Sequence, residues 1–116
     1  MRLEIRRRDV EITEDLRTYL EERLWLALGH FDSHVKVVRA YLRDVNGPRG
    51  GLDKLCRIVV ELDRRGRVVV TGMDTDIRAA VGVAAIRAGV AVKRHVKRGR
   101  ARRRPPRGRT LPLVAA

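Results

Sequence analysis

Hydrophobic and polar residues alternate with a period of two in three segments of this chain, as they do in strands that bury one face, and a fourth, valine-rich segment follows the third after a short turn. The first segment covers residues 2–8 and the second residues 35–45. The third covers residues 56–63 and the fourth residues 67–73, with Arg65-Gly66 as a tight turn between them. We therefore predict four strands, of which the last two form a hairpin.

Two further segments repeat their apolar residues at the 3.6-residue spacing of amphipathic helices. We expect the first helix over residues 14–29, with Thr13 as its N-cap and Gly29 as its end. The second helix opens at residues 74–76, and we expect it to end just before Gly99. Its core stripe consists of Ile77, Ala80, Val81, Ala84, Ala88, Ala91 and Val92.

The resulting order, β-α-β-β-β-α, predicts an α+β fold of two layers, with a four-stranded sheet and both helices on one face. The crossover through the first helix makes the first two strands parallel if they are neighbours, and the later strands form a meander. The Gly- and Pro-containing residues 46–51 form a loop. We place a domain at 1–98 and a basic tail at 99–116, which we expect to lack fixed structure alone.

The charge of the chain is distributed unevenly. Up to Asp76 there are fifteen Lys or Arg residues and fourteen Asp or Glu residues, whereas from Ile77 onward there are twelve Lys or Arg and no acid. The net charge of +13 therefore comes almost entirely from the last third. A surface that binds a polyanion has such an excess, because each cation that neutralises a phosphate releases condensed counterions. The last helix and the tail are therefore candidates for contact with nucleic acid.

Cations project from the end of the last helix and continue beyond it. A helix C-terminus favours cations by itself, by a few tenths to about one kcal/mol each, which explains two or three of them. It does not explain the arginines of the tail, so we favour phosphate binding. On the open face of the second strand, Arg39 and Arg43 are weaker candidates, and Tyr41 between them is the best stacking residue. The candidates in the helix and the tail are Arg87, Lys93, Arg94, Lys97, Arg98, Arg100, Arg102 and Arg103.

The last helix also carries a second apolar stripe opposite its core stripe, formed by Ala79, Val83, Ile86 and Val90. A helix that is apolar on both sides is usually buried on both sides. The stripe is therefore a candidate contact with a protein partner or with a second copy of the chain. Trp25 on the first helix joins it if the two helices lie side by side. Alternatively, these are exposed aliphatic residues of the kind common on proteins.

Catalytic and cofactor chemistry find little support in the sequence. His30 and His34 flank a single carboxylate, which is too small a set for a metal site, and Asp74 and Asp76 are explained by helix capping. No Gly-rich phosphate loop ends in Gly-Lys-Ser/Thr. We therefore expect no enzyme activity, no cofactor and no metal.

The sequence favours a cytoplasmic protein. No apolar run approaches the ~20 residues of a spanning helix, and the first residues have no secretory pattern. The single cysteine, Cys56, permits no internal disulfide. An anionic membrane surface is a weaker rival to RNA, because the only Trp and the only Phe lie far from the basic residues.

Three stretches of the sequence resemble the ribosome hibernation-promoting factor family, also called the ribosome-associated inhibitor family. The stretch from Val10 to Tyr19, with Val-Glu-Ile-Thr-Glu and then Leu-Arg, resembles the entry to its first helix. Residues 44–57, with Asp-Val-Asn-Gly-Pro-Arg-Gly-Gly, resemble a loop and third strand of one branch. Residues 76–94, with Ala-Ala-Val and Arg-Ala-Gly, resemble the last helix. The chain departs from the family at Arg78, where a Tyr is common.

This resemblance implies a fold like that of double-stranded-RNA-binding domains. It implies binding in the channel of the small ribosomal subunit, where mRNA and tRNA otherwise sit, with ribosomal RNA as the partner. It also implies a non-catalytic role, in which the protein blocks translation and preserves idle ribosomes under stress. Long members carry a second, dimerising domain, for which this chain has no room, so it is similar to short members.

Two other functions remain open from the residues alone. One is a protein-interaction module or homodimer that uses the second apolar stripe, with the basic tail steering association. The other is a general structured-RNA-binding protein without preference for ribosomes. The scarcity of aromatic residues favours recognition of RNA by backbone and shape over base stacking.

Overall fold

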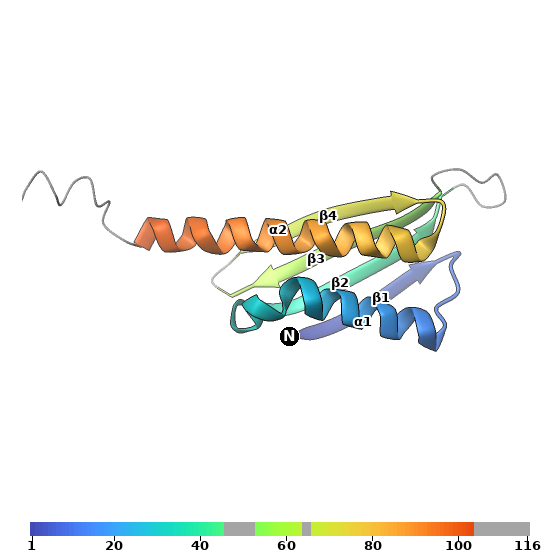
Figure 1. The fold of residues 1–116 in the computed structure, drawn as a ribbon, viewed down its shortest axis with the longest axis horizontal. Coiled ribbons are helices and arrows are strands. Elements are labelled where there is room, and N and C mark those ends of the chain that lie inside the picture. Colours follow the sequence, from blue (N-terminus) through green and yellow to red (C-terminus); the bar gives the residue numbers. More distant parts are fainter. Residues whose placement is uncertain (46–52, 64–65, 104–116) are drawn as a thin grey trace, which may run out of the picture.

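The computed structural model describes residues 1–45, 53–63 and 66–103, with side chains as far as residue 99 (Figure 1). The strands are β1 (Arg2–Arg8), β2 (Val35–Asp44), β3 (Lys54–Leu62) and β4 (Arg67–Asp74). The helices are α1 (Glu14–Leu28), a 3₁₀ helix η1 (Gly29–His34) and α2 (Ile77–Arg103). The predicted order β-α-β-β-β-α and the α+β class are confirmed.

The four strands form one mixed sheet in the order β1-β2-β3-β4. β1 and β2 are parallel, whereas β2–β3 and β3–β4 are antiparallel, as the crossover and the meander predict. Both helices lie side by side on one face of the sheet, and the other face is open (Figure 1). The expected loop at 46–51 and the Arg65 position of the tight turn lie outside the described residues.

The start of α1 follows the prediction. Thr13 has an extended backbone and accepts a hydrogen bond from the Leu16 N–H at 3.1 Å, so one of the free donors at the helix start is satisfied. The end differs, because Gly29 has right-handed φ and ψ of −56° and −34° rather than the left-handed conformation of a glycine stop. The chain therefore tightens directly into the 3₁₀ helix η1.

The core lies between the sheet and the two helices. α1 contributes one leucine per turn, Leu16, Leu20, Leu24 and Leu28, all of which are buried. α2 contributes mainly small residues, which let it approach the sheet closely. A Cβ on Gly72 of β4 would meet the Ala80 carbonyl oxygen and lie 2.7 Å from the Ala84 nitrogen. The contact between β4 and α2 therefore requires a glycine in the strand.

The predicted end of α2 is wrong. The helix continues through Gly99 to Arg103, where the sequence predicted an end just before the glycine. A glycine inside a helix costs only about 1 kcal/mol relative to alanine, and nothing lies within 4 Å of the position that a Cβ on Gly99 would take. The last turns of α2 consequently project beyond the end of the sheet (Figure 1).

Candidate nucleic-acid interface

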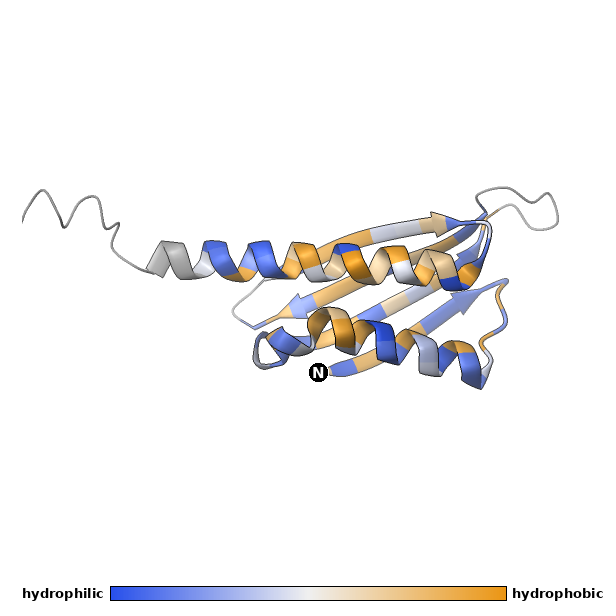
Figure 2. Cartoon of the chain, in the orientation of Figure 1, coloured by the Kyte–Doolittle hydropathy of each residue, from blue (hydrophilic) through white to orange (hydrophobic). Residues whose placement is uncertain are grey.

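The outward face of α2 changes its chemistry along the helix. Ile86 and Val90 are exposed in the middle of the helix, with 68% and 46% of their surface accessible. At the 100° rotation per residue of a helix, Lys93 and Lys97 continue this stripe, and Arg94 and Arg98 lie beside it. All four of these cations are exposed. The change from apolar to hydrophilic along α2 is visible in Figure 2.

The inner side of these last turns is fixed to the domain. Val92 and Val96 are buried in the core, so they hold the backbone from which the four cations project. His95 packs over the β3–β4 turn, where a Cβ on Gly66 would collide with its imidazole. His95 therefore positions the helix. Its place against the turn also explains why the cations beside it face outward.

Arg87 occupies the same side of α2 as Arg94 and Arg98, but it is held by the sheet. Its Nη1 donates a hydrogen bond of 2.6 Å to the carbonyl oxygen of Thr71 in β4. One guanidinium has five N–H donors, so this bond leaves others directed to solvent. Arg87 thus links the middle of α2 to β4 and stays a candidate for phosphate contact.

The open face of the sheet separates the two arginines that the sequence grouped together. Arg39 makes ion pairs with Glu4 at 3.2 Å and with Glu61 at 2.9 Å, and it is only partly exposed. The hydrogen bonds that Arg39 donates to Glu61 and then to Glu4 raise the pKa of Arg39, while the Arg2 and Arg39 guanidinium groups lower the pKa of Glu4. Arg39 is thus charge-compensated within the sheet. Arg43, by contrast, is exposed at the end of β2.

Four further arginines that the sequence did not single out lie around Arg43, namely Arg6, Arg7, Arg8 and Arg57. A hollow of about 250 Å³ at this end of the sheet is lined by arginines of three strands and by Tyr41. Arg6, Arg8 and Arg57 were not singled out, because they occur in the part of the sequence whose total charge is balanced. The period-two pattern already places Arg6 and Arg8 on one face of β1, but only the strand register brings them beside Arg43.

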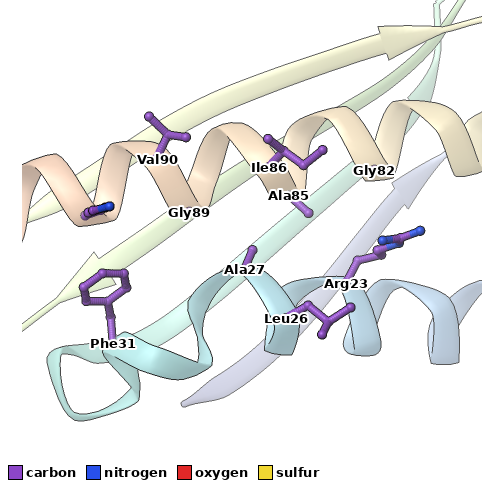
Figure 3. Close-up of a pocket in the computed structure, with 10 residues that line it drawn as sticks. Arg23, Leu26, Ala27, Phe31, Gly82, Ala85, Ile86, Gly89 and Val90 are labelled. Atoms are coloured by element: carbon purple, nitrogen blue, oxygen red, sulfur yellow. The ribbon is translucent and has the colours of Figure 1, made fainter.

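A groove of about 380 Å³ runs between α1 and α2 (Figure 3). Ile86 and Val90 line one side and Leu26 lines the other, and Leu26 is 78% exposed. The helices approach most closely where a Cβ on Gly89 would lie 3.0 Å from the Ala27 carbonyl oxygen. Ile86 and Val90, two of the four residues of the predicted second apolar stripe, therefore form one wall of a groove.

Three of the residues expected in this apolar contact, Trp25, Ala79 and Val83, do not line the groove. Trp25 is exposed, but it lines a separate hollow with Met1 and Leu3. Leu26, which the sequence reasoning did not select, faces α2 in its place. Val83 is half-buried and does not line the groove. A rotation of 100° between adjacent helical residues accounts for the exchange of Trp25 and Leu26.

The remaining tail candidates lie at or beyond the limit of the description. Arg100, Arg102 and Arg103 belong to α2, so their backbone is helical where the sequence predicted a tail. The arginines from Arg104 onward lie outside the described residues. Within the described ranges, no group of three or more His, Cys, Asp or Glu side chains is arranged to hold a metal ion. No described helix has both the length and the hydropathy needed to cross a membrane.

Comparison with known proteins adds independent information. The family model described as "Sigma 54 modulation protein / S30EA ribosomal protein" matches residues 3–100. The crystal structure of the N-terminal domain of Thermus thermophilus Protein Y superimposes with a TM-score of 0.67 at 28% identity, covering 82% of this chain and 99% of that chain. A ribosomal subunit interface protein from Coxiella burnetii gives a TM-score of 0.69 at 15% identity, covering 84% and 99%, and this second likeness shows the fold alone. A search of curated protein sequences gives no match.

Proposed function

The chain belongs to the sigma 54 modulation protein / S30EA ribosomal protein family, and from this membership we propose that it is a non-catalytic factor that binds the small ribosomal subunit. In this proposal it occupies the channel that mRNA and tRNA otherwise use. Occupation of the channel inhibits translation or stabilises idle ribosomes under stress. The proposed site of action is the cytoplasm, and the proposed partner is ribosomal RNA.

One observation carries the proposal: the last turns of α2 present four cations to solvent without a neighbouring acid. Lys93, Arg94, Lys97 and Arg98 are exposed, and none of them forms an ion pair within the described part of the chain. No acidic residue follows Asp76 in the sequence. Because like charges repel along one helix, this surface gains most from a partner that brings closely spaced negative charges, as folded RNA does.

The helical conformation of residues 99–103 strengthens this argument. Because α2 continues to Arg103, the backbone of Arg100, Arg102 and Arg103 extends the helix beyond the sheet. A rod about one helix diameter, roughly 10–12 Å, in thickness is suited to a narrow channel between RNA segments. With the four exposed cations, these arginines supply six to eight phosphate contacts. Such a number predicts a slope of log K against log salt of about −4 to −7.

The decisive experiment is co-sedimentation of the protein with isolated small ribosomal subunits over a series of salt concentrations. The test variant replaces Lys93, Arg94, Lys97 and Arg98 with Gln. The control replaces the same number of exposed cations elsewhere, Arg2, Arg17, Lys36 and Arg67, so that both variants carry the same net charge. We expect the test variant to lose about 3 to 4 units of the salt slope, and the control to stay near the wild type.

A second measurement addresses the channel itself. If the protein occupies the path of mRNA and tRNA, small subunits that are preloaded with both should bind it at least tenfold more weakly than empty subunits. Equal binding to both would place the protein on another surface of the subunit. Equal losses in the test and control variants would show that net charge alone, and not the end of α2, determines binding.

The groove between the helices supports a second candidate function, a homodimer. Leu26, Ile86 and Val90 are large apolar residues that remain exposed on both walls of one groove. A contiguous apolar patch of this kind is typical of contact sites. Light scattering of an Ile86→Glu/Val90→Glu variant tests it. A dimer in the wild type that becomes a monomer in the variant supports this candidate, and a monomer in both rejects it.

A further inference from the structure

The open face of the sheet has two ends of opposite electrostatic character. Side chains alternate between the faces of a strand, so the register identifies which residues share the open face. In one half of this face, Arg39 pairs with Val59 of β3 and Glu4 of β1. In the other half, Tyr41 pairs with Arg6 and Arg57. Each half therefore carries arginines, and the halves differ in the acids beside them.

The first half is charge-compensated. The Arg39 guanidinium is shared between Glu4 and Glu61, which come from the two strands that flank β2. Arg2 forms a further ion pair with Glu4 at 2.6 Å. Arg2 and Arg39 have their negative partners within the protein, so they have little need for an external anion.

The second half has cations without acids. Arg6, Arg8, Arg43 and Arg57 are all exposed and line or adjoin the hollow of about 250 Å³, and no carboxylate lines it. None of these four guanidinium groups has an ion pair in the ranges that the structure covers. Two acids adjoin these arginines in the sequence, because Asp9 follows Arg8 and Asp44 follows Arg43, but neither lines the hollow. Asp44 lies on the helix-facing side of β2, where its carboxylate is 3.0 Å from the Lys54 amino group.

An aromatic ring lies among these arginines. Tyr41 is half-buried at the centre of the hollow, and the Arg57 guanidinium lies over its ring at 5.9 Å from the centroid. Arg57 is thus oriented by a cation–π contact and keeps its N–H groups available. A ring beside several guanidinium groups matches a nucleotide, which offers a flat base and a phosphate together.

We propose that this hollow is a second RNA-binding site, in which Arg6, Arg8, Arg43 and Arg57 bind backbone phosphates and Tyr41 contacts a base or sugar. Guanidinium groups suit this role because their planar fork bonds two phosphate oxygens at once. Neighbouring strands are about 4.8 Å apart, so arginines on three adjacent strands span roughly 10 Å. That span allows contact with more than one phosphate of the same RNA strand.

The proposal rests on the proposed function and extends it. The helices cover one face of the sheet (Figure 1), whereas Arg6, Arg8, Arg43 and Arg57 lie on the other face by the strand register, so one straight RNA segment cannot contact both surfaces. The protein would therefore lie between two RNA segments, one held by the end of α2 and one by the sheet. Loss of one surface should weaken binding without abolishing it.

The test uses an Arg43→Gln/Arg57→Gln variant, with Arg2→Gln/Arg67→Gln as the control. Both pairs lie on the open face and remove two charges, but the control pair lies in the half that contains Glu4 and Glu61. Binding to isolated small subunits is measured against salt. We expect the test variant to lose about 1.4 to 1.8 units of slope and at least fivefold in affinity, and the control to lose less than twofold. An Arg6→Gln/Arg8→Gln variant should repeat the loss, which guards against misfolding of the first variant.

The outcomes separate this inference from the proposed function. If the variant of the α2 end loses binding while both variants of the hollow behave like the control, the second site does not exist and the proposed function stands. If neither the α2 end nor the hollow matters, both ideas fail. Inorganic pyrophosphate and a labelled ten-nucleotide oligouridylate distinguish the source of the phosphate. Suppose that the Arg43→Gln/Arg57→Gln variant loses binding to pyrophosphate but binds the oligonucleotide and the small subunit as the wild type does. The hollow would then be assigned to a small phosphorylated ligand, and the RNA site would be overturned.

Discussion

The two halves of α2 belong to one continuous helix but are shaped by different requirements. In the first half, Ala80, Ala84 and Ala88 are buried against the sheet, and the residues are small because β4 approaches closely. From Lys93 to Arg98 the exposed residues of the helix are Lys and Arg, and beyond them its final turns project past the end of the sheet. The first half is determined by packing and the second by charge. Substitutions should therefore affect stability in the first half and RNA binding in the second.

The largest expected effect comes from filling the contact between β4 and the first half of α2. In a Gly72→Ala variant the new Cβ would press on backbone atoms of Ala80 and Ala84, which cannot move as a flexible side chain can. We expect the free energy of unfolding to fall by about 3 kcal/mol, near the upper end for an overpacked core. This is a large share of the roughly 5–15 kcal/mol by which domains are stable. Urea denaturation measures it.

A Met73→Ala variant is the control for this prediction. Met73 is the next residue of β4 and lies exposed on the open face, so its truncation should change the free energy of unfolding by less than about 1 kcal/mol. If Gly72→Ala were as stable as the control, α2 would be free to move away from β4. The distinction between a packed and a projecting half would then lose its basis.

Much of the fold was predictable from local patterns. The strands follow from the alternation of apolar and polar residues. The N-cap follows from the Thr13 side chain, whose partner, the Leu16 N–H, is only three residues away. The sequence is therefore sufficient to locate both. The end of α2 was not predictable in this way. A glycine is a weak stop signal, and whether a helix continues depends on the space around it, as it does at Gly99.

The candidate site was predictable where it depends on composition. The exposed cations at the end of α2 follow from an absence of acids after Asp76. The compensation of Arg39 depends on contacts with residues 35 positions before it and 22 after it, and no local pattern reveals these. The grouping of Arg43 with Arg57 likewise requires the register between β2 and β3. Long-range pairing therefore limits what the sequence alone determines here.

The next largest effect distinguishes Arg94 and Arg98, near the end of α2, from Arg87, which lies on the same side of the helix but is bonded to the sheet. An Arg94→Gln/Arg98→Gln variant should bind small subunits about tenfold more weakly at physiological salt and lose about 1.4 to 1.8 units of salt slope. Arg87→Gln removes the hydrogen bond to the Thr71 carbonyl, so it should lower the free energy of unfolding by up to about 1 kcal/mol. Equilibrium binding and urea denaturation of both variants provide the comparison. A binding loss for Arg87→Gln equal to that of the double variant would extend the phosphate surface into the packed half.

A smaller effect tests whether the last turns are helical in the free protein. Nothing lies near the Cβ position of Gly99, so a Gly99→Ala variant should gain helix stability of up to about 1 kcal/mol. Circular dichroism should show unchanged or slightly higher helicity, and binding to small subunits should be equal or tighter. Gly89→Ala is the matched control, because a Cβ there would lie 3.0 Å from the Ala27 carbonyl and should lower stability. Weaker binding by Gly99→Ala would mean that the chain must bend at this glycine on the ribosome.

The smallest expected effect is that of the cations at the end of α2 on the stability of the packed half, and the alkylation rate of Cys56 measures it. This residue is the only cysteine, and its burial in the core shared with α2 raises the pKa of its thiol to about 12 from 9.0. The raised pKa keeps the thiol of the folded protein almost entirely protonated at neutral pH, so alkylation should proceed through unfolded chains. The raised pKa also means that the thiol stabilises the fold fully below pH 9 and loses this contribution as the pH rises towards 12.

Neutralising Arg94 and Arg98 should therefore leave the alkylation rate at pH 8 within about twofold of the wild type, because those side chains are outside the core and surface changes rarely exceed about 0.5 kcal/mol. A tenfold faster reaction would show that the projecting turns help to hold the packed half closed, and that charge and packing act on α2 as one unit.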